Sequence, residues 1–577
     1  MDDVTSSYLA LSLAGNTAST VRLRIRYFDN FSLLRRIYIK RQNNERASRS
    51  WAPTDQKEVL MNDDAQQKKG LTRRNFLKSA GGVAAVAGMA AGGLAAGVRE
   101  GSAAAGSMPK KWDGTYDVVI IGSGFAGLAA AMEAKNAGAS AVVIEKMAVH
   151  GGNSIINGGD FCAPGTKLQK EAGVQDSPDL MYNDMMKAGL YLNHPELART
   201  LADQAKDALE WCENYVGAKF TRLNFHGGHS VKRANQTVNA SGSELVNKML
   251  AKTRALGVAV QTRTKMERMI ADKDGRIVGI EVKTGYRFPD EKSGKTAYIK
   301  ARKAVILTSG GFSNDIPLRR IEDPRLTEKF ESTNQPGATG EALLAACMAG
   351  AMDVQMDWIQ LGPWTSPDEK GFGNVPLFCE RLVGYGPMID PVKGKRFFKE
   401  TGNRKERADA IILLGHPVII MGDSYAVPKQ VFPKALEKGL ESGAVKKFDS
   451  LEALAKNYAM PVEAFTQEIA RWNSFVEKKK DTDFDCMIFP DAKPTVTPPF
   501  YAARLWPKVH HTMGGLVIDK NAQVIGFDLK PLKGLYAAGE VTGGVHGAVR
   551  LGGVAMADCV VFGRIAGRNA AKETARG

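Results

Sequence analysis

Beyond residue 115, the chain alternates short apolar runs with longer stretches of helical character. The run YDVVII at 116–121 predicts a strand, and the Ala-rich segment that follows residue 127 predicts a helix. AVVI at 141–144 predicts a second strand, and GLYAAGE at 534–540 predicts a late strand that ends in a turn. The order strand, glycine-rich turn, helix and strand indicates a Rossmann-like α/β unit.

The turn between the first strand and the helix has the glycine spacing of a dinucleotide-binding loop. Gly122, Gly124 and Gly127, with Ala126 among them, permit a tight turn, close approach of the backbone to a pyrophosphate and close helix packing. The start of the helix offers free N–H groups to the phosphates. Glu145 ends the second strand, eighteen residues beyond Gly127, where its carboxylate is predicted to accept hydrogen bonds from the adenosine ribose.

These features suit NAD as well as FAD, and two further segments favour FAD. A second glycine-rich loop follows Glu145, and the late segment that ends at Glu540 is a candidate to return to the same ligand. A nucleotide held by the first and last parts of a chain suits FAD, because its isoalloxazine ring extends far from its adenine. The cofactor contacts predicted in the second loop are Lys146, Asn153, Ser154, Gly158 and Gly159.

The chain has 577 residues, more than one hydrophobic core usually supports, which predicts at least two domains. Its formal net charge of +16 divides into +4 over residues 1–60, +3 over residues 61–105 and +9 over the remainder. That remainder contains no dense basic run and no nucleic-acid motif, so no nucleic-acid function is expected. The six cysteines form no CxxC pair, no CxxCH haem attachment and no zinc spacing. We therefore expect no metal site and no haem in this chain.

Residues 61–105 have the features of a twin-arginine export signal. TRRNFLK at 72–78 precedes a charge-free stretch rich in Ala and Gly, and AAA at 103–105 supplies an A-x-A cleavage pattern. Ala and Gly contribute little transfer free energy, so a stable membrane anchor is not expected. We expect the twin-arginine export machinery to carry the folded protein to the periplasm. Residues 1–60 are expected to be a spurious extension upstream of a true start at Met61.

Five blocks of sequence resemble a single flavoprotein family. The blocks are ARKAVILTSGGF at 301–312, GATGEALLAACMAGA at 337–351, GKRFFKE at 394–400, HHTMGG at 510–515 and GEVTGGVHGAVRLGGVAMAD at 539–558. In this order they resemble the fumarate reductase and succinate dehydrogenase flavoprotein family. The closer resemblance is to its soluble periplasmic branch, which includes flavocytochrome fumarate reductases and urocanate reductase. The resemblance runs from about Tyr116 to the carboxyl end.

The resemblance implies an α/β fold in which a Rossmann-like FAD-binding domain is interrupted by an inserted α+β capping domain. It places the FAD-binding domain at 106–360 and 507–577, the cap at 361–506 and the active site at their junction. It also implies non-covalent FAD and a separate c-type cytochrome or quinol-linked electron donor. Further cofactor contacts are expected from Glu341, His511, Glu540, Gly553, Ala555 and Met556.

The resemblance also implies catalytic roles for residues of this chain. In the family a His and an Arg clamp the substrate carboxylate, and they correspond to His510 and Arg550. Hydride passes from flavin N5 to the β-carbon of an alkene, and a cap arginine, Arg404 here, gives a proton to the α-carbon. Glu380 matches the family's relay carboxylate, and Arg407 lies one helical turn beyond Arg404. Fixed cations lower the barrier because hydride addition builds negative charge on the α-carbon and carboxylate.

Several positions depart from the fumarate reductase pattern. Gly362 stands where those enzymes carry a His for the second carboxylate, and Cys379, expected to be a small packing residue, replaces a Thr. Val383 replaces the relay arginine, and an arginine stands at Arg381 instead. We therefore expect a substrate with one carboxylate and a bulkier or planar far end, such as urocanate or an aryl acrylate. Nearby aromatic residues that either line a larger pocket or fill the cap core are Trp358, Trp364, Phe372 and Tyr385.

The favoured hypothesis is a reductase of the C=C bond of an α,β-unsaturated carboxylate. A fumarate reductase flavoprotein subunit is one alternative. A second is a flavin dehydrogenase or oxidase that acts on another substrate such as a ketosteroid, which would leave the Arg404, His510 and Arg550 set without a carboxylate. A third is a non-catalytic flavin carrier.

Overall fold

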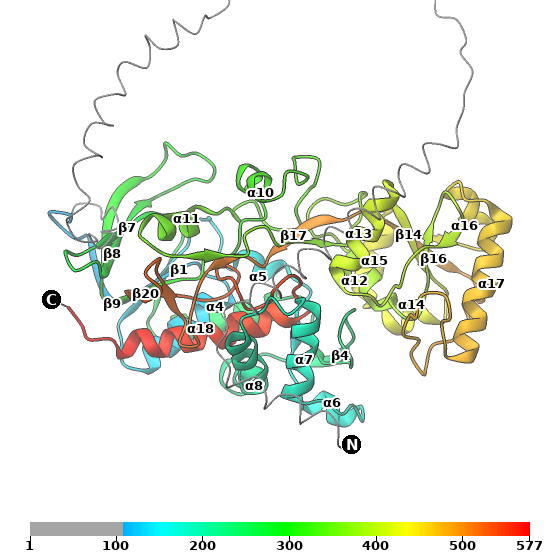
Figure 1. The fold of residues 1–577 in the computed structure, drawn as a ribbon, viewed down its shortest axis with the longest axis horizontal. Coiled ribbons are helices and arrows are strands. Elements are labelled where there is room, and N and C mark those ends of the chain that lie inside the picture. The colour runs from blue at the N-terminus through cyan, green and yellow to red at the C-terminus, as the bar shows by residue number, and fades with distance from the viewer. Residues whose placement is uncertain (1–107, 577) are drawn as a thin grey trace, which may run out of the picture. The chain divides into compact units, whose positions relative to one another are not determined.

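The computed structural model describes residues 108–576, so the predicted extension at 1–60 and export signal at 61–105 lie outside the described residues. An eight-stranded sheet occupies the first part of the fold (Figure 1). Its strands are β1 (Gly114–Ile121), β2 (Ala141–Ile144), β6 (Ala259–Gln261), β7 (Thr264–Ala271), β8 (Ile277–Thr284), β9 (Lys295–Leu307), β19 (Gln523–Ile525) and β20 (Pro531–Ala537).

The sheet is mostly parallel. Its main path runs β19-β20-β9-β1-β2-β6, with parallel pairing from β20 to β6 and an antiparallel edge at β19. β8 joins β9 and β7 joins β8 as antiparallel strands. The apolar run at 118–121 is almost fully buried, as expected for a parallel strand covered on both faces.

Two long-separated helices pack against one another beside this sheet. They are α4 (Phe125–Asn136), directly after β1, and α18 (Val554–Lys572), near the carboxyl end (Figure 1). A Cβ on Gly563 of α18 would lie 2.5 Å from the Ala126 carbonyl oxygen of α4, so the absence of a side chain permits this close contact. The first and last parts of the chain therefore share one core.

Smaller elements surround the main sheet. The strands are β3 (Asp160–Cys162), β4 (Phe220–Asn224) and β5 (Ala234–Thr237) in one sheet, and β10 (Asp353–Val354) with β18 (Gly515–Leu516) in another. The helices are α5 (Gly152–Ile156), α6 (Lys167–Glu171), α7 (Pro178–Ala188), α8 (Pro195–Trp211), the π-helix η2 (Cys212–Val216), α9 (Ser243–Ala255), α10 (Ile316–Glu322) and α11 (Glu341–Met348).

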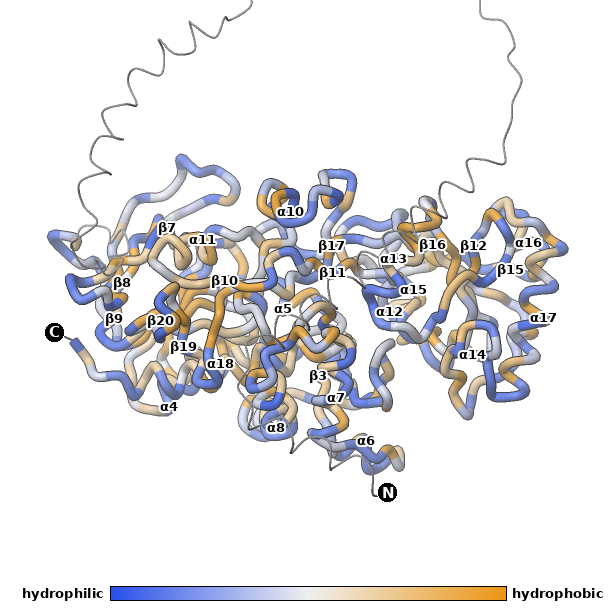
Figure 2. Tube along the Cα trace, viewed as in Figure 1, coloured by the Kyte–Doolittle hydropathy of each residue, from blue (hydrophilic) through white to orange (hydrophobic). Residues whose placement is uncertain are grey.

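A second, antiparallel sheet lies in the region predicted to be the cap. Its order is β13 (Lys395–Arg396), β12 (Met388–Asp390), β14 (Val418–Gly422), β16 (Phe500–Leu505) and β15 (Val445–Phe448). The accompanying helices are α12 (Val375–Leu382), α13 (Arg404–Leu414), α14 (Ala426–Gln430), α15 (Pro433–Glu441), α16 (Leu451–Asn457) and α17 (Val462–Lys478). Two apolar clusters of its own fill this part, and Figure 2 shows hydrophobic residues along its inner strands.

The two parts are joined through a pair of short strands. β11 (Ile359–Gly362) and β17 (Lys508–Thr512) pair antiparallel where the chain enters and leaves the second part. The expected fold class, a Rossmann-like FAD-binding domain with an inserted α+β part, is confirmed, and the limits 361–506 stay a prediction. Within residues 108–576, no helix is both long and apolar enough to span a bilayer.

Candidate active site

A groove runs past the carboxyl ends of β1 and β2, where a doubly wound sheet usually binds a nucleotide. Nine of the residues predicted to contact the cofactor line it: Gly122, Gly124, Ala126, Glu145, Lys146, Asn153, Ser154, Glu341 and Glu540. Gly127 and Gly159 line neither this groove nor the neighbouring cavity. Side chains at these two positions would meet the Gly122 carbonyl oxygen at 2.0 Å and the Thr237 hydroxyl at 2.1 Å, so both glycines serve close packing.

The glycine-rich loop after β1 is shaped for a phosphate. Gly122 has a φ of +105°, and a Cβ there would lie 2.4 Å from the Thr308 carbonyl oxygen. α4 begins after Gly124, which has no side chain to cap the helix; the Phe125 N–H donates to the Ser154 hydroxyl at 3.0 Å. Backbone N–H groups and the positive end of the helix dipole therefore face the groove, an arrangement that suits a pyrophosphate.

Two acidic residues of the groove are held by neighbouring groups. Glu145 accepts hydrogen bonds from the Ser123 hydroxyl at 2.6 Å and the Met147 N–H at 2.9 Å. Lys146 forms an ion pair with Glu341 at 3.0 Å. Burial alone would raise the pKa of Glu341, but the charge of Lys146 and the Thr339 hydrogen bond hold it below its usual value. The fixed Glu145 carboxylate suits the hydroxyls of a ribose.

The groove leads into a second cavity, and five residues line both: Phe125, Asn153, Ser154, Glu540 and Cys559. A single long ligand can therefore extend from the glycine loop into the second cavity, which fits the length of FAD. The predicted residues that line this cavity are Gly158, Glu380, Arg404, His510, His511, Arg550, Gly553, Ala555 and Met556. The Nε2 atom of His511 is buried there without a hydrogen-bond partner among the described residues, which leaves it free for a cofactor.

An irregularity in β17 brings two consecutive histidines to the same cavity. His511 lies opposite Gln360 and Val509 opposite Leu361, so His510 is an extra residue on this strand. In a regular strand, neighbouring side chains point to opposite faces, and a bulge re-aims one of them. Both His510 and His511 consequently line the cavity.

Two buried arginines bring positive charge to the cavity. Arg404 and Arg550 are buried, at 6% and 4% exposure. Nε and Nη1 of Arg404 and Nε of Arg550 have no hydrogen-bond partner among the described residues. Burial, together with the positive charge of Arg404, lowers the pKa of Arg550 well below its usual value. An anion in the cavity would satisfy both guanidinium groups.

His510 is held as a neutral imidazole beside these cations. Burial lowers its pKa well below the usual value, and the charges of Arg550 and Arg404 lower it further. Its Nδ1 lies 2.7 Å from the Thr333 hydroxyl, and its ring meets Trp364 edge to face at 4.6 Å. A hydroxyl that donates to Nδ1 leaves the proton on Nε2, which can then donate a hydrogen bond to a carboxylate.

Arg404 lies at the first position of α13, and a capping box fixes that helix start. The Asn403 side chain accepts from the Glu406 N–H, and the Glu406 side chain accepts from the Asn403 N–H, both at 3.0 Å. The guanidinium carbon of Arg404 lies 5.1 Å from the Trp364 ring centre. Arg407, one turn later, does not line the cavity and donates to Glu380 at 2.6 Å instead.

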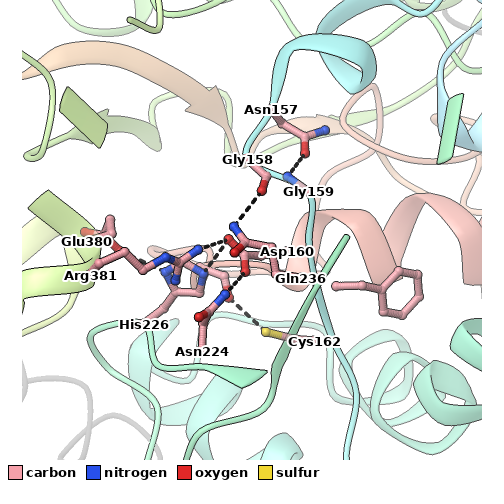
Figure 3. Close-up of polar contacts among 12 residues, drawn as sticks. Asn157, Gly158, Gly159, Asp160, Cys162, Asn224, His226, Gln236, Glu380 and Arg381 are labelled. Atoms are coloured by element: carbon pink, nitrogen blue, oxygen red, sulfur yellow. Dashed lines mark hydrogen bonds and ion pairs between the residues drawn. The ribbon is translucent and has the colours of Figure 1, made fainter. Parts of the chain in front are cut away.

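Behind Arg404 lies a buried chain of charged groups. Glu380 lies 4.0 Å from Arg404 and accepts a hydrogen bond from Nδ1 of His226 at 2.9 Å. On its other side His226 faces Asp160, whose carboxylate also accepts from Arg381 at 2.8 Å (Figure 3). Burial would raise the pKa of Glu380, but Arg407 and then the His226 hydrogen bond keep it well below its usual value.

The structure shows which side chains surround the positions that depart from the fumarate reductase pattern. A Cβ on Gly362 would lie 3.0–3.2 Å from the Trp364 indole, so Trp364 fills the space beside this position. Trp364 and Phe372 line the cavity. Tyr385 belongs to the cap core, where it stacks on Phe489, and Trp358 packs against the core of the first part. Cys379 is a buried residue of the cap core, and Val383 is buried beside it.

Three residues at the site were not identified from the sequence: Asp160, His226 and Thr333. Asp160 directly follows the second glycine-rich loop, and a carboxylate at that place was an available signal. His226 lies in LNFHGGHS at 223–230, which matches no motif, and Thr333 lies in an irregular segment. Only the tertiary fold brings these residues to Glu380 and His510.

Comparison with known proteins agrees with this geometry. Residues 117–556 match the family model described as "FAD binding domain". The acrylate reductase flavoprotein subunit of Shewanella woodyi is 42% identical over 505 residues, covering 86% of this chain and 98% of that protein. The urocanate reductase of Eggerthella lenta is 32% identical over 469 residues, covering 79% of this chain and 74% of that protein.

A solved structure shares the fold across both parts of the chain. The open conformation of a flavocytochrome c3 fumarate reductase superposes with a TM-score of 0.64 and 31% identity, and covers 90% of this chain and 85% of that one. The groove, the adjoining cavity and these similarities lead to one assignment. This chain belongs to the FAD-binding flavoprotein family that includes acrylate, urocanate and fumarate reductases, and it is an FAD-dependent oxidoreductase.

Proposed function

We propose that this protein reduces the C=C bond of an α,β-unsaturated acid that carries a single carboxylate. Acrylate is the first candidate, because the relative with 42% identity is named an acrylate reductase flavoprotein subunit. The observation that carries the proposal is the pair of buried arginines, Arg404 and Arg550, whose free nitrogens meet at one cavity beside His510. Leaving such charges buried without a partner is costly, and a substrate carboxylate relieves that cost.

Each of these side chains has a distinct part in the proposed reaction. His510, with its proton on Nε2, and Arg550 hold the carboxylate and stabilise the negative charge that develops on it. Reduced FAD supplies the hydride that the alkene receives. Arg404 gives a proton to the carbon next to the carboxyl group. Glu380, 4.0 Å from Arg404, stabilises its charged form and transmits the replacement proton.

Donation of a proton by a guanidinium requires that its charged form be disfavoured. Burial lowers the pKa of Arg404, and the charge of Arg407 lowers it further, while Glu380 opposes the shift. The first position of a helix adds to this effect, because the positive end of the helix dipole repels a cation. The proton can therefore leave Arg404 as negative charge builds on the substrate carbon.

The far end of the cavity favours an uncharged group. Trp364 and Phe372, together with Pro376 and Leu377, line the cavity. Trp364 packs against Gly362, where a second carboxylate would need a cationic or hydrogen-bonding partner. Acrylate leaves this end empty, whereas urocanate or an aryl acrylate would place a planar ring against the two aromatic side chains.

The electron supply and the cellular location belong to the same proposal. We infer that a separate c-type cytochrome or quinol-linked protein reduces the flavin, since the relative from Shewanella woodyi is named as a subunit. The twin-arginine pattern at 72–78 supports export to the periplasm. A peptide from residues 1–60 in the mass spectrum of the native protein would contradict a start at Met61.

The proposal is tested by reducing the purified holoenzyme anaerobically and adding single acids while flavin absorbance is followed. The panel contains acrylate, methacrylate, cinnamate, urocanate and fumarate, with propionate as the saturated control. We expect rapid reoxidation by an acid with one carboxylate, acrylate first, and at least 10-fold slower reoxidation by fumarate. Preference for fumarate would identify a fumarate reductase. Failure of all the acids would contradict the proposal and favour a flavin carrier or a dehydrogenase.

A further inference from the structure

The residue expected to supply Glu380 with protons in fumarate reductases, an arginine, is replaced by Val383, which lies buried in the cap core. A different side chain reaches Glu380 in this protein. Nδ1 of His226 lies 2.9 Å from Oε2 of Glu380, and Nε2 lies 3.3 Å from Oδ2 of Asp160. Oε2 is also the Glu380 oxygen nearest to Arg404. The imidazole therefore lies between two carboxylates (Figure 3); Nδ1 is hydrogen-bonded to Glu380, whereas Nε2 is within ion-pair distance of Asp160 but makes no hydrogen bond among the described residues.

His226 is better suited to move a proton than the arginines around it. Arg407 binds the other oxygen of Glu380 at 2.6 Å, and Arg381 binds Asp160 at 2.8 Å. Guanidinium groups hold their protons up to a pKa above about 12, whereas an imidazole exchanges protons near neutral pH. His226 is 5% exposed and lines the cavity, which places it between the buried carboxylates and the space that substrate and water enter.

We propose that His226 is the proton reservoir of the relay: its imidazolium returns a proton through Glu380 to Arg404, while Asp160 holds its other nitrogen. This inference rests on the proposed function, because it assumes that Arg404 protonates the reduced substrate. His226 does not touch the reacting atoms, so it acts as a positioning and proton-supplying residue behind Arg404.

The step needs no reactant other than the substrate, reduced FAD and a proton from solvent. Arg404 loses one proton to the substrate carbon and becomes neutral. Nδ1 of the His226 imidazolium gives one proton to Glu380, which passes it to Arg404 once the guanidinium closes the 4.0 Å gap to Oε2. The N–H bond at Nδ1 breaks, and an N–H bond on Arg404 forms. The neutral imidazole keeps its Nε2 proton toward Asp160 and takes one proton from solvent before the next turnover.

The surroundings of His226 set the direction of its pH dependence. Asp160 from β3 and Glu380 from α12 bring negative charge to the His226 ring, and Arg381 from α12, with Arg404 and Arg407 from α13, bring positive charge to the same two carboxylates. His229, in the same loop, also adjoins it. Asp160→Asn removes one favourable charge. The alkaline limb of the kcat profile should therefore move to lower pH in this variant.

The first test compares His226→Gln with His229→Gln in the holoenzyme. His229 is equally buried but bonds to the Gly552 carbonyl oxygen and does not line the cavity. We expect His226→Gln to lower kcat about 10- to 100-fold and to increase the solvent deuterium isotope effect, because proton supply becomes rate-limiting. Its FAD content and its rate of flavin reduction should stay as in the wild type. His229→Gln should stay within about 3-fold of the wild type.

A second variant separates proton supply from a structural loss. His226→Ala leaves space beside Glu380, so added imidazole should raise the kcat of this variant at least 10-fold. An unchanged kcat, pH profile and isotope effect in His226→Gln would overturn the proposal. A loss that imidazole does not restore, and that His229→Gln matches, would overturn it as well.

Exchange of the histidine C2 hydrogen, followed by mass spectrometry, tests the same inference without any substrate. The pH dependence of this exchange at His226 should move to lower pH in Asp160→Asn, because one neighbouring negative charge is lost. An unchanged titration would contradict the relay. Failure of every acid to reoxidise the wild-type flavin would instead contradict the proposed function.

Discussion

Nη2 of Arg404 lies 4.0 Å from Oε2 of Glu380, close enough for strong electrostatic coupling but too far for a direct hydrogen bond. Arg407, one turn later on α13, takes the other Glu380 oxygen at 2.6 Å. The two arginines therefore differ in whether their nitrogens can bind a ligand in the cavity. Arg404 keeps Nε and Nη1 free at the cavity, whereas Arg407 is fixed behind it.

Arg404→Ala is expected to retain FAD and to lose about 10²- to 10⁴-fold in kcat, because a positioned proton donor contributes a factor of this size. Lys405→Ala is the matched control, since Lys405 lies next to Arg404 on the same helix but pairs with Asp409. Steady-state turnover with a reduced dye and the preferred acid measures both. Equal activity of the two variants would remove Arg404 from the mechanism.

Trp364→Leu should widen the acid preference. The shorter side chain opens space beside His510 and Gly362, so kcat/KM for a 3-substituted acrylate should rise about 10-fold relative to acrylate. Trp472→Leu is the control, because Trp472 is also fully buried in the cap but does not line the cavity. Both variants should lose stability, and only Trp364→Leu should change the ratio of kcat/KM values. An unchanged ratio would show that Trp364 does not limit the substrate.

Glu145→Gln should weaken FAD binding about 10-fold or more, because hydrogen bonds to a charged acceptor contribute about 1.5–3 kcal/mol. The Ser123 and Met147 contacts hold this carboxylate at the groove. Titration of the apoprotein with FAD, followed by flavin fluorescence, gives the Kd. Glu281→Gln serves as the control, because Glu281 pairs with Arg268 on β7 and lies away from the groove. Equal Kd values for the two variants would exclude Glu145 from the FAD site.

The stability of the apoprotein should depend on the ionisation of Glu540. Burial raises the pKa of Glu540 to about 7 from a usual value of 4.5, although the Thr512 N–H and Arg550 oppose the shift. Since the folded-state pKa is the higher one, this group's contribution to stability is full below pH 4.5. It is lost as the pH rises through about 7.

Urea unfolding of wild-type and Glu540→Gln apoprotein at pH 5 and pH 8 tests this linkage. The difference in the free energy of unfolding should change by about 2–3 kcal/mol between the two pH values, in favour of the variant at pH 8. A difference that does not depend on pH would place the Glu540 pKa near its usual value.

The fold was largely predictable because its signals are local. AVVI at 141–144 forms β2 at those residues, and YDVVII at 116–121 lies within β1. The glycines and Glu145 were recognisable because a phosphate and a ribose impose fixed spacings on one short segment. The cap sheet, in contrast, has no such local signature, and its presence was predicted from the family resemblance alone.

Cavity residues could be predicted from the sequence only where they lie within a motif of the family. His510 and Arg550 belong to quoted motifs, but their meeting with Arg404 depends on the bulge in β17 and the capping box of α13. Trp364 was left open between lining the pocket and packing in the core, because apolar side chains in both places look alike in sequence. His226 and Asp160 come together from segments 66 residues apart, and no spacing rule connects them.

In the proposed complex, His510 and Arg550 hold one carboxylate while Arg404 faces the carbon beside it. A crystal structure of the oxidised holoenzyme with acrylate tests this most directly. We predict that the carboxylate bonds to Nε2 of His510 and to the Arg550 guanidinium, with Arg404 next to the α-carbon and the vinyl group toward Trp364. A carboxylate bound outside this pair, or an Arg404 side chain turned away from the bound acid, would contradict the account.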